Sequence, residues 1–188
     1  YLGTTNSLAV DSEIRDSSEA GFIAALSSIG AGGLTDATTA QGVVFLNRGV
    51  YSWLAATIPA KVTLFCASGS STVIRPTSND TSITVYGTIE NCEIDVGGRP
   101  YTGNLFTIKT GGRVKNTRIV NFLNNDQTTQ STVFLVRDSS DVNISAYIDG
   151  YGGCVQDNAC GSLFTGVRSS DVYLNLETST KASYVTTG

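Results

Sequence analysis

Two short motifs recur through the second half of the chain at a fixed distance from each other, and no other feature limits the possible folds as strongly. In each copy a phenylalanine lies eight residues before a valine; the pairs are Phe106 with Val114, Phe134 with Val142, and Phe164 with Val172. Earlier apolar residues extend the valine series with spacings of 27, 25, 28 and 30 residues, along Val62, Ile89, Val114, Val142 and Val172. A period of roughly 20–50 residues indicates a solenoid or another array of stacked units.

A coil of this length holds about three short strands and three turns, and it cannot bury its apolar side chains alone. Stacking a second coil about 4.8 Å above the first pairs the free strand edges and extends the core. We therefore predict an all-β fold, a right-handed single-stranded parallel β-helix of about five coils, in which the three phenylalanines form an inward stack.

Asparagine recurs at one place in two of the copies. The segments around Asn91 and Asn116 both read small-x-apolar-x-Asn-x-x-Ile. Asn tolerates a left-handed backbone conformation better than most residues, so these two side chains are expected to stack at a sharp bend between strands.

Four cysteines are present. Cys66 and Cys92 lie 26 residues apart, close to one repeat, which predicts neighbouring coils, nearly the same phase and Cα atoms within about 7 Å if they form a disulfide. Cys154 and Cys160 are close enough in sequence to close a small disulfide loop. The alternative for all four is a free thiol, with two of them buried as small apolar side chains.

The N-terminal segment, residues 1–41, is expected to contain a capping helix. Asp16 is followed by Glu19 three residues later, the capping-box pattern, and apolar residues then recur at helical spacing until Gly30. An amphipathic helix here would cover the open end of the first coil. Residues 42–188 are predicted to form the coils, and we expect the natural chain to continue beyond them.

The order of these segments resembles the opening of the pectate-lyase-like β-helix proteins. The similarity covers residues 16–76, from the capped helix through the strands at 42–51, 58–64 and 72–74. It departs at Asn47-Arg48, where the family usually has proline, and lacks the glycine expected after Cys66. That superfamily includes polysaccharide lyases, glycoside hydrolases and phage tailspikes, so the resemblance implies a fold more firmly than a function.

Composition excludes several functions. The net charge is −4, which disfavours nucleic acid as a partner, and the chain has no histidine. Without histidine it cannot contain a Ser-His-Asp triad, a Cys-His dyad or a histidine-bearing zinc site. We expect no metal and no other cofactor. No apolar run is long enough to span a membrane.

Asp138 and Asp141 are the candidate catalytic residues. Family members of the polygalacturonase type use neighbouring aspartates and a Gly-His-Gly segment, which are both missing here. The resemblance to calcium-dependent lyases, which use clustered acids and an arginine base, points to Asp138 and Asp141 beside Arg137. An ordinary ion pair is the alternative interpretation.

Lys109, Arg137 and Arg168 lie three or four residues after the phenylalanines and are expected to align on adjacent coils. Such a row suits the binding of acidic sugars or of a charged surface glycan. The simpler interpretation is a solvated face neutralised by nearby aspartates, and it is favoured because stacked like charges are tolerated only when countered.

The leading functional hypothesis is a virion structural protein of tailspike or receptor-binding type that presents a rigid β-helix to host surface glycans. It would lie on the virion surface with other virion proteins and form a homotrimer through the loops at 97–104, 122–132 and 150–161. The alternatives are a secreted polysaccharide lyase or glycoside hydrolase and a non-catalytic cell-surface adhesin.

Overall fold

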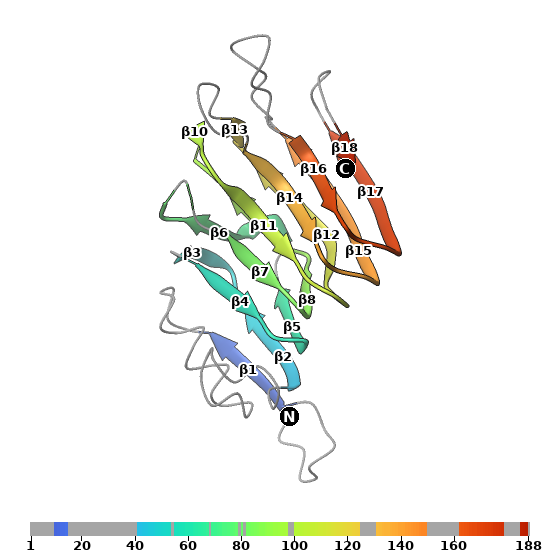
Figure 1. Cartoon of the computed structure of the whole chain (residues 1–188). Helices are drawn as coiled ribbons and strands as arrows, with labels where there is room; N and C mark the ends of the chain where they lie inside the picture. The colour runs from blue at the N-terminus through green and yellow to red at the C-terminus, as the bar shows by residue number, and fades with distance from the viewer. Residues whose placement is uncertain are drawn as a thin grey trace.

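The described part of the chain is an all-β parallel solenoid of about four turns (Figure 1). The computed structural model describes residues 10–14, 41–53, 55–67, 69–78, 80, 82–97, 100–124, 131–149, 162–178 and 185–187. Every strand pair among these residues is parallel, which confirms the predicted fold class.

The strands form three sheets. The ten-stranded sheet contains β1 (Val10–Ile14), β2 (Gln41–Leu46), β3 (Gly49–Trp53), β5 (Lys61–Cys66), β6 (Thr72–Pro76), β8 (Thr88–Glu90), β9 (Glu93–Asp95), β12 (Arg113–Val120), β15 (Val142–Asp149) and β17 (Val172–Thr178). The six-stranded sheet contains β4 (Ala56–Ile58), β7 (Ile83–Val85), β11 (Asn104–Ile108), β14 (Thr132–Arg137), β16 (Ser162–Val167) and β18 (Val185–Thr187). The third consists of β10 (Pro100–Tyr101) and β13 (Leu123–Asn124).

The ten-stranded sheet changes character along the solenoid. In the early coils its strands are interrupted at a corner, as between β5 and β6 and between β8 and β9. Strand β12 instead runs through the corner, since it pairs with β8 by its first half and with β9 by its second. Strands β15 and β17 continue this pattern, so the later coils have one long strand where the earlier coils have two.

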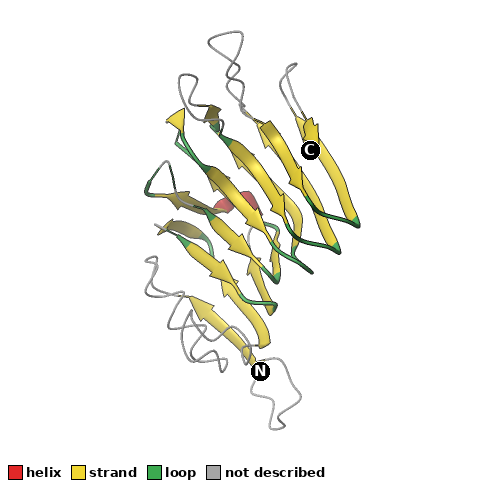
Figure 2. Ribbon diagram, in the orientation of Figure 1, coloured by secondary structure: helices red, strands yellow, loops and turns green. Residues whose placement is uncertain are grey.

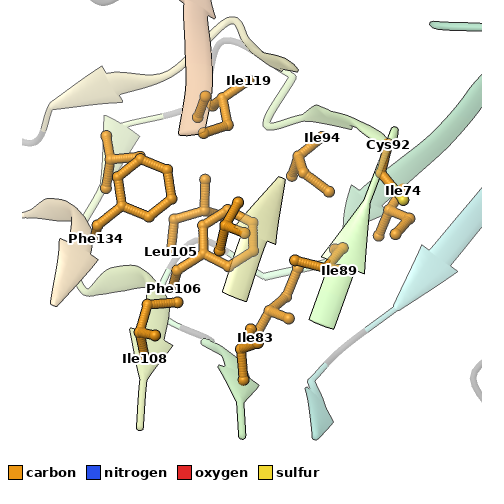
Figure 3. Packing of buried hydrophobic residues seen from close by; sticks show 14 of the residues in the cluster. Ile74, Ile83, Ile89, Cys92, Ile94, Leu105, Phe106, Ile108, Ile119 and Phe134 are labelled. Atoms are coloured by element: carbon orange, nitrogen blue, oxygen red, sulfur yellow. The ribbon is translucent and has the colours of Figure 1, made fainter. Parts of the chain in front are cut away.

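The core is built by residues that alternate along these short strands. Burial alternates in β2, β5 and β15, because successive side chains point to opposite faces of a strand. The phenylalanine stack is confirmed: Phe106 pairs with Phe134 and Phe134 with Phe164, and all three are buried. Ile83 continues the stack below Phe106, and the rings of Phe106 and Phe134 lie against each other in Figure 3.

The residues of the predicted valine series face inward, as expected, but some of them are not directly opposite each other on neighbouring coils. Ile89 pairs with Val114 and Val142 with Val172, as expected. However, the residue opposite Val114 is Ile144, two positions after Val142. Ile144 lies eight positions after Val136, whereas Val114 lies only six positions after Ile108, the partner of Val136. Leu64 likewise replaces Val62 opposite Ile89. A shift of two keeps each side chain facing inward, so the core is unaffected.

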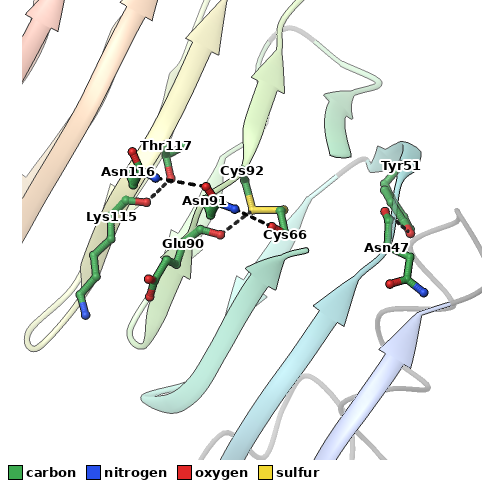
Figure 4. Close-up of a disulfide and its surroundings, with 9 residues drawn as sticks. All are labelled: Asn47, Tyr51, Cys66, Glu90, Asn91, Cys92, Lys115, Asn116 and Thr117. Carbon is green, nitrogen blue, oxygen red and sulfur yellow. Dashed lines mark hydrogen bonds between the residues drawn. A yellow bond between two sulfur atoms is a disulfide. The ribbon is translucent and has the colours of Figure 1, made fainter. Parts of the chain in front are cut away.

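The asparagines lie at the corner, as predicted. Asn91 and Asn116 have φ angles of 60° and 45°, in the left-handed region. The Asn116 amide donates to Oδ1 of Asn91 at 3.1 Å, and the Asn91 amide donates to the carbonyl oxygen of Cys66 at 2.9 Å (Figure 4). The two side chains therefore link three neighbouring coils by hydrogen bonds at the bend.

Cys66 and Cys92 form a disulfide with Cα atoms 5.0 Å apart, on neighbouring coils (Figure 4). This agrees with their predicted phase. Both residues are buried, so the bond lies inside the solenoid wall. Cys154 and Cys160 lie outside the described residues.

The predicted capping helix also lies outside the described residues. Among the described residues, one short 3-10 helix is present, η1 (Gly69–Ser71), which is drawn in red in Figure 2. Strand β1 lies within the predicted N-terminal segment and pairs in parallel with β2, so the sheet extends one strand before residue 41. No helix in the described ranges is long and apolar enough to cross a membrane.

Candidate functional site

Two of the three candidate cations lie in register where the six-stranded sheet turns into the ten-stranded sheet. Lys109 directly follows β11, and Arg137 is the last residue of β14. Because Ile108 pairs with Val136, the next residues, Lys109 and Arg137, lie on neighbouring coils about 4.8 Å apart. We call the row formed by Tyr86, Lys109 and Arg137 the basic corner.

Tyr86 joins this row one coil earlier. It follows β7, whose Val85 pairs with Ile108, and the backbone N–H of Lys109 donates to the Val85 carbonyl at 2.9 Å. Tyr86 is 39% exposed, a large fraction for an aromatic residue. Tyr86 was not among the site residues predicted from the sequence. A signal was nevertheless present, since Ile83-Thr84-Val85-Tyr86 has apolar residues at the same first and third positions as Phe106-Thr107-Ile108-Lys109, with threonine between them.

Arg168 does not belong to the row, and this part of the prediction is wrong. Val167 is the residue opposite Arg137, which places Arg168 next to Asp138. Its guanidinium binds that carboxylate through two hydrogen bonds, from Nε at 2.6 Å and from Nη2 at 2.9 Å. Arg168 lies four positions after Phe164, whereas Arg137 lies only three positions after Phe134. No bulge compensates for this difference, because β14 and β16 stay in register from Phe134 to Arg137.

The two candidate catalytic acids are both bound to arginine. Both oxygens of Asp141 accept hydrogen bonds from Nη2 of Arg113 at 2.8 Å, and Asp138 is bound by Arg168. The hydrogen bond from Arg168 lowers the pKa of Asp138, helped by the charges of Arg168, Arg137 and Lys109. A general acid must keep its proton near neutral pH, so the surroundings of Asp138 oppose that role.

A shallow depression of about 390 Å³ lies beside the basic corner, where the turns after β11, β14 and β16 stack. The hydroxyl groups of two of its serines, Ser139 and Ser169, form hydrogen bonds within these turns. Oγ of Ser139 donates to the Arg137 carbonyl at 2.8 Å, and Oγ of Ser169 donates to that of Val167 at 2.9 Å. The backbone N–H of Ser139 donates to Oγ of Ser169 at 3.3 Å. These turns therefore hold the basic corner in place.

The basic corner retains unpaired charge. Neither Lys109 nor Arg137 makes an ion pair with any residue that the structure describes. The nearest carboxylate along the chain, that of Asp138, already has both oxygens bound to Arg168. Within the described ranges no cluster of three or more His, Cys, Asp or Glu side chains is arranged to hold a metal ion.

Comparisons of the chain with protein-family models, with curated proteins and with solved structures found no match.

Proposed function

We propose that this chain is a glycan-binding β-solenoid whose basic corner binds acidic sugars of a surface polysaccharide. The observation that carries the proposal is the pair of in-register cations, Lys109 and Arg137, which lack an ion-pair partner in the described part of the chain. Like charges directly opposite each other on neighbouring strands destabilise a sheet. A bound carboxylate or sulfate between them would replace that repulsion with two charge-assisted hydrogen bonds.

Tyr86 completes the arrangement chemically. An exposed ring next to two cations offers an apolar surface for the face of a sugar, while the cations hold its acidic group. The ring needs no other anchor, because it is held on the same coil wall as Lys109 by the pairing of β7 with β11. Binding on a rigid element avoids much of the entropy cost of ordering a loop.

We further propose that the solenoid is the shaft of a homotrimeric virion fibre of tailspike type, related to the pectate-lyase-like proteins, on the virion surface. Support comes from the stacked parallel coils, which give a stiff rod, and from the low share of charged residues, 15%. Host surface glycans and other virion proteins would be its partners. Light scattering on the intact protein tests the stoichiometry, and a stable monomer at micromolar concentration contradicts the trimer.

A secreted polysaccharide lyase or glycoside hydrolase is the alternative function. The pairing of Asp138 with Arg168 and of Asp141 with Arg113 favours binding over catalysis at this corner.

The glycan proposal is tested with two double variants of equal charge change. Lys109→Gln with Arg137→Gln removes the basic corner, while Arg48→Gln with Lys61→Gln removes two exposed cations elsewhere. Binding is measured by calorimetry against polygalacturonate and dextran sulfate at several salt concentrations. We expect the first variant to lose binding at least about tenfold and to have a weaker salt dependence. Equal losses in both variants would show that the protein attracts polyanions only through general charge.

A further inference from the structure

We infer a second sugar-binding site, specific for non-acidic glycans, in a groove on the outer face of β12, β15 and β17. The sheet groove, as we call it, has a volume of about 330 Å³ and is lined by Asn116, Thr117, Arg118, Ser145, Ala146, Tyr147, Asn175 and Glu177. It belongs to the long-strand face of the ten-stranded sheet and shares no residue with the basic corner. The inference does not depend on the function proposed for that corner.

A β-bulge produces the groove. Val114 pairs with Ile144 and Thr117 with Ala146, so Lys115 and Asn116 together lie opposite the single residue Ser145. The bulge turns both Lys115 and Asn116 to the exposed side and returns Thr117 to the interior, where it is 1% exposed. Bulges of this kind redirect side chains and open the sheet surface locally, often beside binding sites.

The chemistry of the groove suits a sugar. Arg118, Tyr147 and Glu177 form one in-register row across three coils, and Ser145 pairs with Asn175 in the row beside it. Tyr147 is 38% exposed and supplies an aromatic face for the apolar side of a sugar ring. The amide and hydroxyl groups around it can donate hydrogen bonds to sugar hydroxyls and accept them, and the carboxylate can accept them.

The charges of the groove select against acidic glycans. Arg118 is held on both sides, since Nη1 donates to Glu93 at 3.0 Å and Nη2 donates to Asp149 at 2.6 Å. Glu177 has no ion-pair partner among the described residues. Three carboxylates (Glu93, Asp149 and Glu177) against one guanidinium leave a net charge of −2 around the groove. The next cation on β12, Lys115, lies opposite Glu90 and adds no excess positive charge.

The walls of the groove are fixed before any ligand arrives. Two carboxylates on neighbouring coils hold Arg118, and the hydrogen bond from Arg118 to Asp149 is the main cause that raises the pKa of the guanidinium. The amide of Asn116 is held by Asn91, which is itself bound to the backbone beside the disulfide (Figure 4). Preformed hydrogen-bonding groups of this kind favour specific binding, because little order has to be created on association.

The experiment uses the full chain and two exposed tyrosines as reciprocal controls. Tyr147 and Tyr86 are almost equally exposed, at 38% and 39%, but lie in the sheet groove and the basic corner respectively. Wild type, Tyr147→Ala, Glu177→Gln and Tyr86→Ala are titrated with maltohexaose, cellohexaose, mannohexaose and chitohexaose, and separately with oligogalacturonate. Amide chemical shifts are followed by NMR, which also shows that each variant is folded.

We expect at least one neutral oligosaccharide to shift the amides of residues 145–147 and 175–177. Tyr147→Ala and Glu177→Gln should each weaken this binding by about tenfold, whereas Tyr86→Ala should leave it unchanged. The inference is overturned if none of the four neutral sugars shifts these amides, or if Tyr147→Ala binds them as the wild type does. Oligogalacturonate shifting the groove amides would also overturn it. The oligogalacturonate shifts at residues 86, 109 and 137 report on the basic corner separately, so failure of one site does not hide the other.

Discussion

Phe106 and Phe134 stack on consecutive coils with their ring centroids 5.2 Å apart and their planes inclined by 16°. Both rings are fully buried and lie in the middle of a column that runs from Ile83 to Phe164. In a solenoid each coil contacts only its neighbours, so this column joins the coils to one another.

Replacing Phe134 by alanine should therefore destabilise the protein by about 3–5 kcal/mol, because it removes a buried ring between two others and leaves a cavity. Phe134→Leu keeps more of the volume and should cost clearly less. Urea unfolding followed by circular dichroism measures both. Equal losses for the two variants would contradict this expectation, since they would mean that the contact between the rings, and not the buried volume, accounts for the stability.

The disulfide between Cys66 and Cys92 should stabilise the fold by roughly 3.5 kcal/mol, from the loop-closure entropy of a 26-residue loop. Changing both cysteines to alanine removes that constraint from the unfolded state. The urea midpoint of this variant should fall to near that of the reduced wild type, which serves as the control. A native protein in which Cys66 and Cys92 react as free thiols would contradict the bond.

Asn91 should be hard to replace by alanine, because its side chain binds Cys66 and Asn116 and its φ angle is 60°. The loss of hydrogen bonding and the left-handed backbone together should cost about 2–3 kcal/mol in Asn91→Ala. Glycine accepts this backbone conformation, so Asn91→Gly should cost roughly 1 kcal/mol less. Thermal unfolding compares the stabilities of the two variants. If Asn91→Ala were more stable than Asn91→Gly, the backbone conformation would not have the role that we assign to it.

Gly112 lies in the turn before β12, where the coils approach closely. A Cβ atom there would lie 2.5 Å from the Val85 carbonyl oxygen and 2.7 Å from Cγ2 of Ile108. Gly112→Ala should therefore cost about 1–3 kcal/mol of stability through overpacking. Gly49→Ala is the control, since its Cβ would meet only the Tyr51 ring at 3.7 Å. A small and equal effect at both positions in a denaturation series would contradict the close approach.

Asp95 should make the stability depend on acid. Burial raises its pKa, but hydrogen bonds from Asn121, Arg75 and the Gly97 backbone outweigh burial, so the pKa lies below the ordinary 3.8. A carboxyl group with a lowered pKa in the folded state stabilises the protein fully above the pKa of the unfolded state, and this contribution is lost as the pH falls through the folded pKa. The free energy of unfolding should therefore decrease below about pH 4.

Asp95→Asn tests this contribution. The variant should be less stable than the wild type at pH 7, and the difference between them should shrink as the pH falls toward 2. Asp171→Asn, at an exposed carboxylate that makes no ion pair within the described residues, is the control. Urea unfolding at a series of pH values provides the measurement, and an Asp95→Asn curve parallel to the wild type would count against the role of Asp95.

Much of the fold could be predicted because its determinants are local and periodic. The spacing of Phe106, Phe134 and Phe164 gave the stacking phase, and the spacing of Cys66 and Cys92 placed them on neighbouring coils. Register errors of two residues, as at Val142, did not change which side chains face the core. The period of two along a strand conserves the inward face under such shifts.

The candidate sites were harder to predict, because they depend on knowing the register between neighbouring coils to within a single residue. Arg168 was expected beside Arg137 but binds Asp138, since a shift of one residue changes the neighbour on the adjacent coil. Tyr86 was not assigned to the basic corner, because its motif has isoleucine in the phenylalanine position. The sheet groove has no counterpart in the sequence pattern, since it is formed by a bulge opposite Ser145.

The sequence by itself therefore determined that the chain forms stacked parallel coils, which residues face inward, where the asparagine corner lies, and that Cys66 and Cys92 lie on neighbouring coils. These properties follow from the repeat length and from the alternation of apolar residues, which are both visible in the sequence. That these two cysteines form a disulfide was decided by the tertiary structure. Only the tertiary structure decided which charges meet across neighbouring coils, such as Arg118 with Glu93 and Asp149. Turn lengths and bulges set that register, and their conformations are selected by hydrogen bonds and packing between coils.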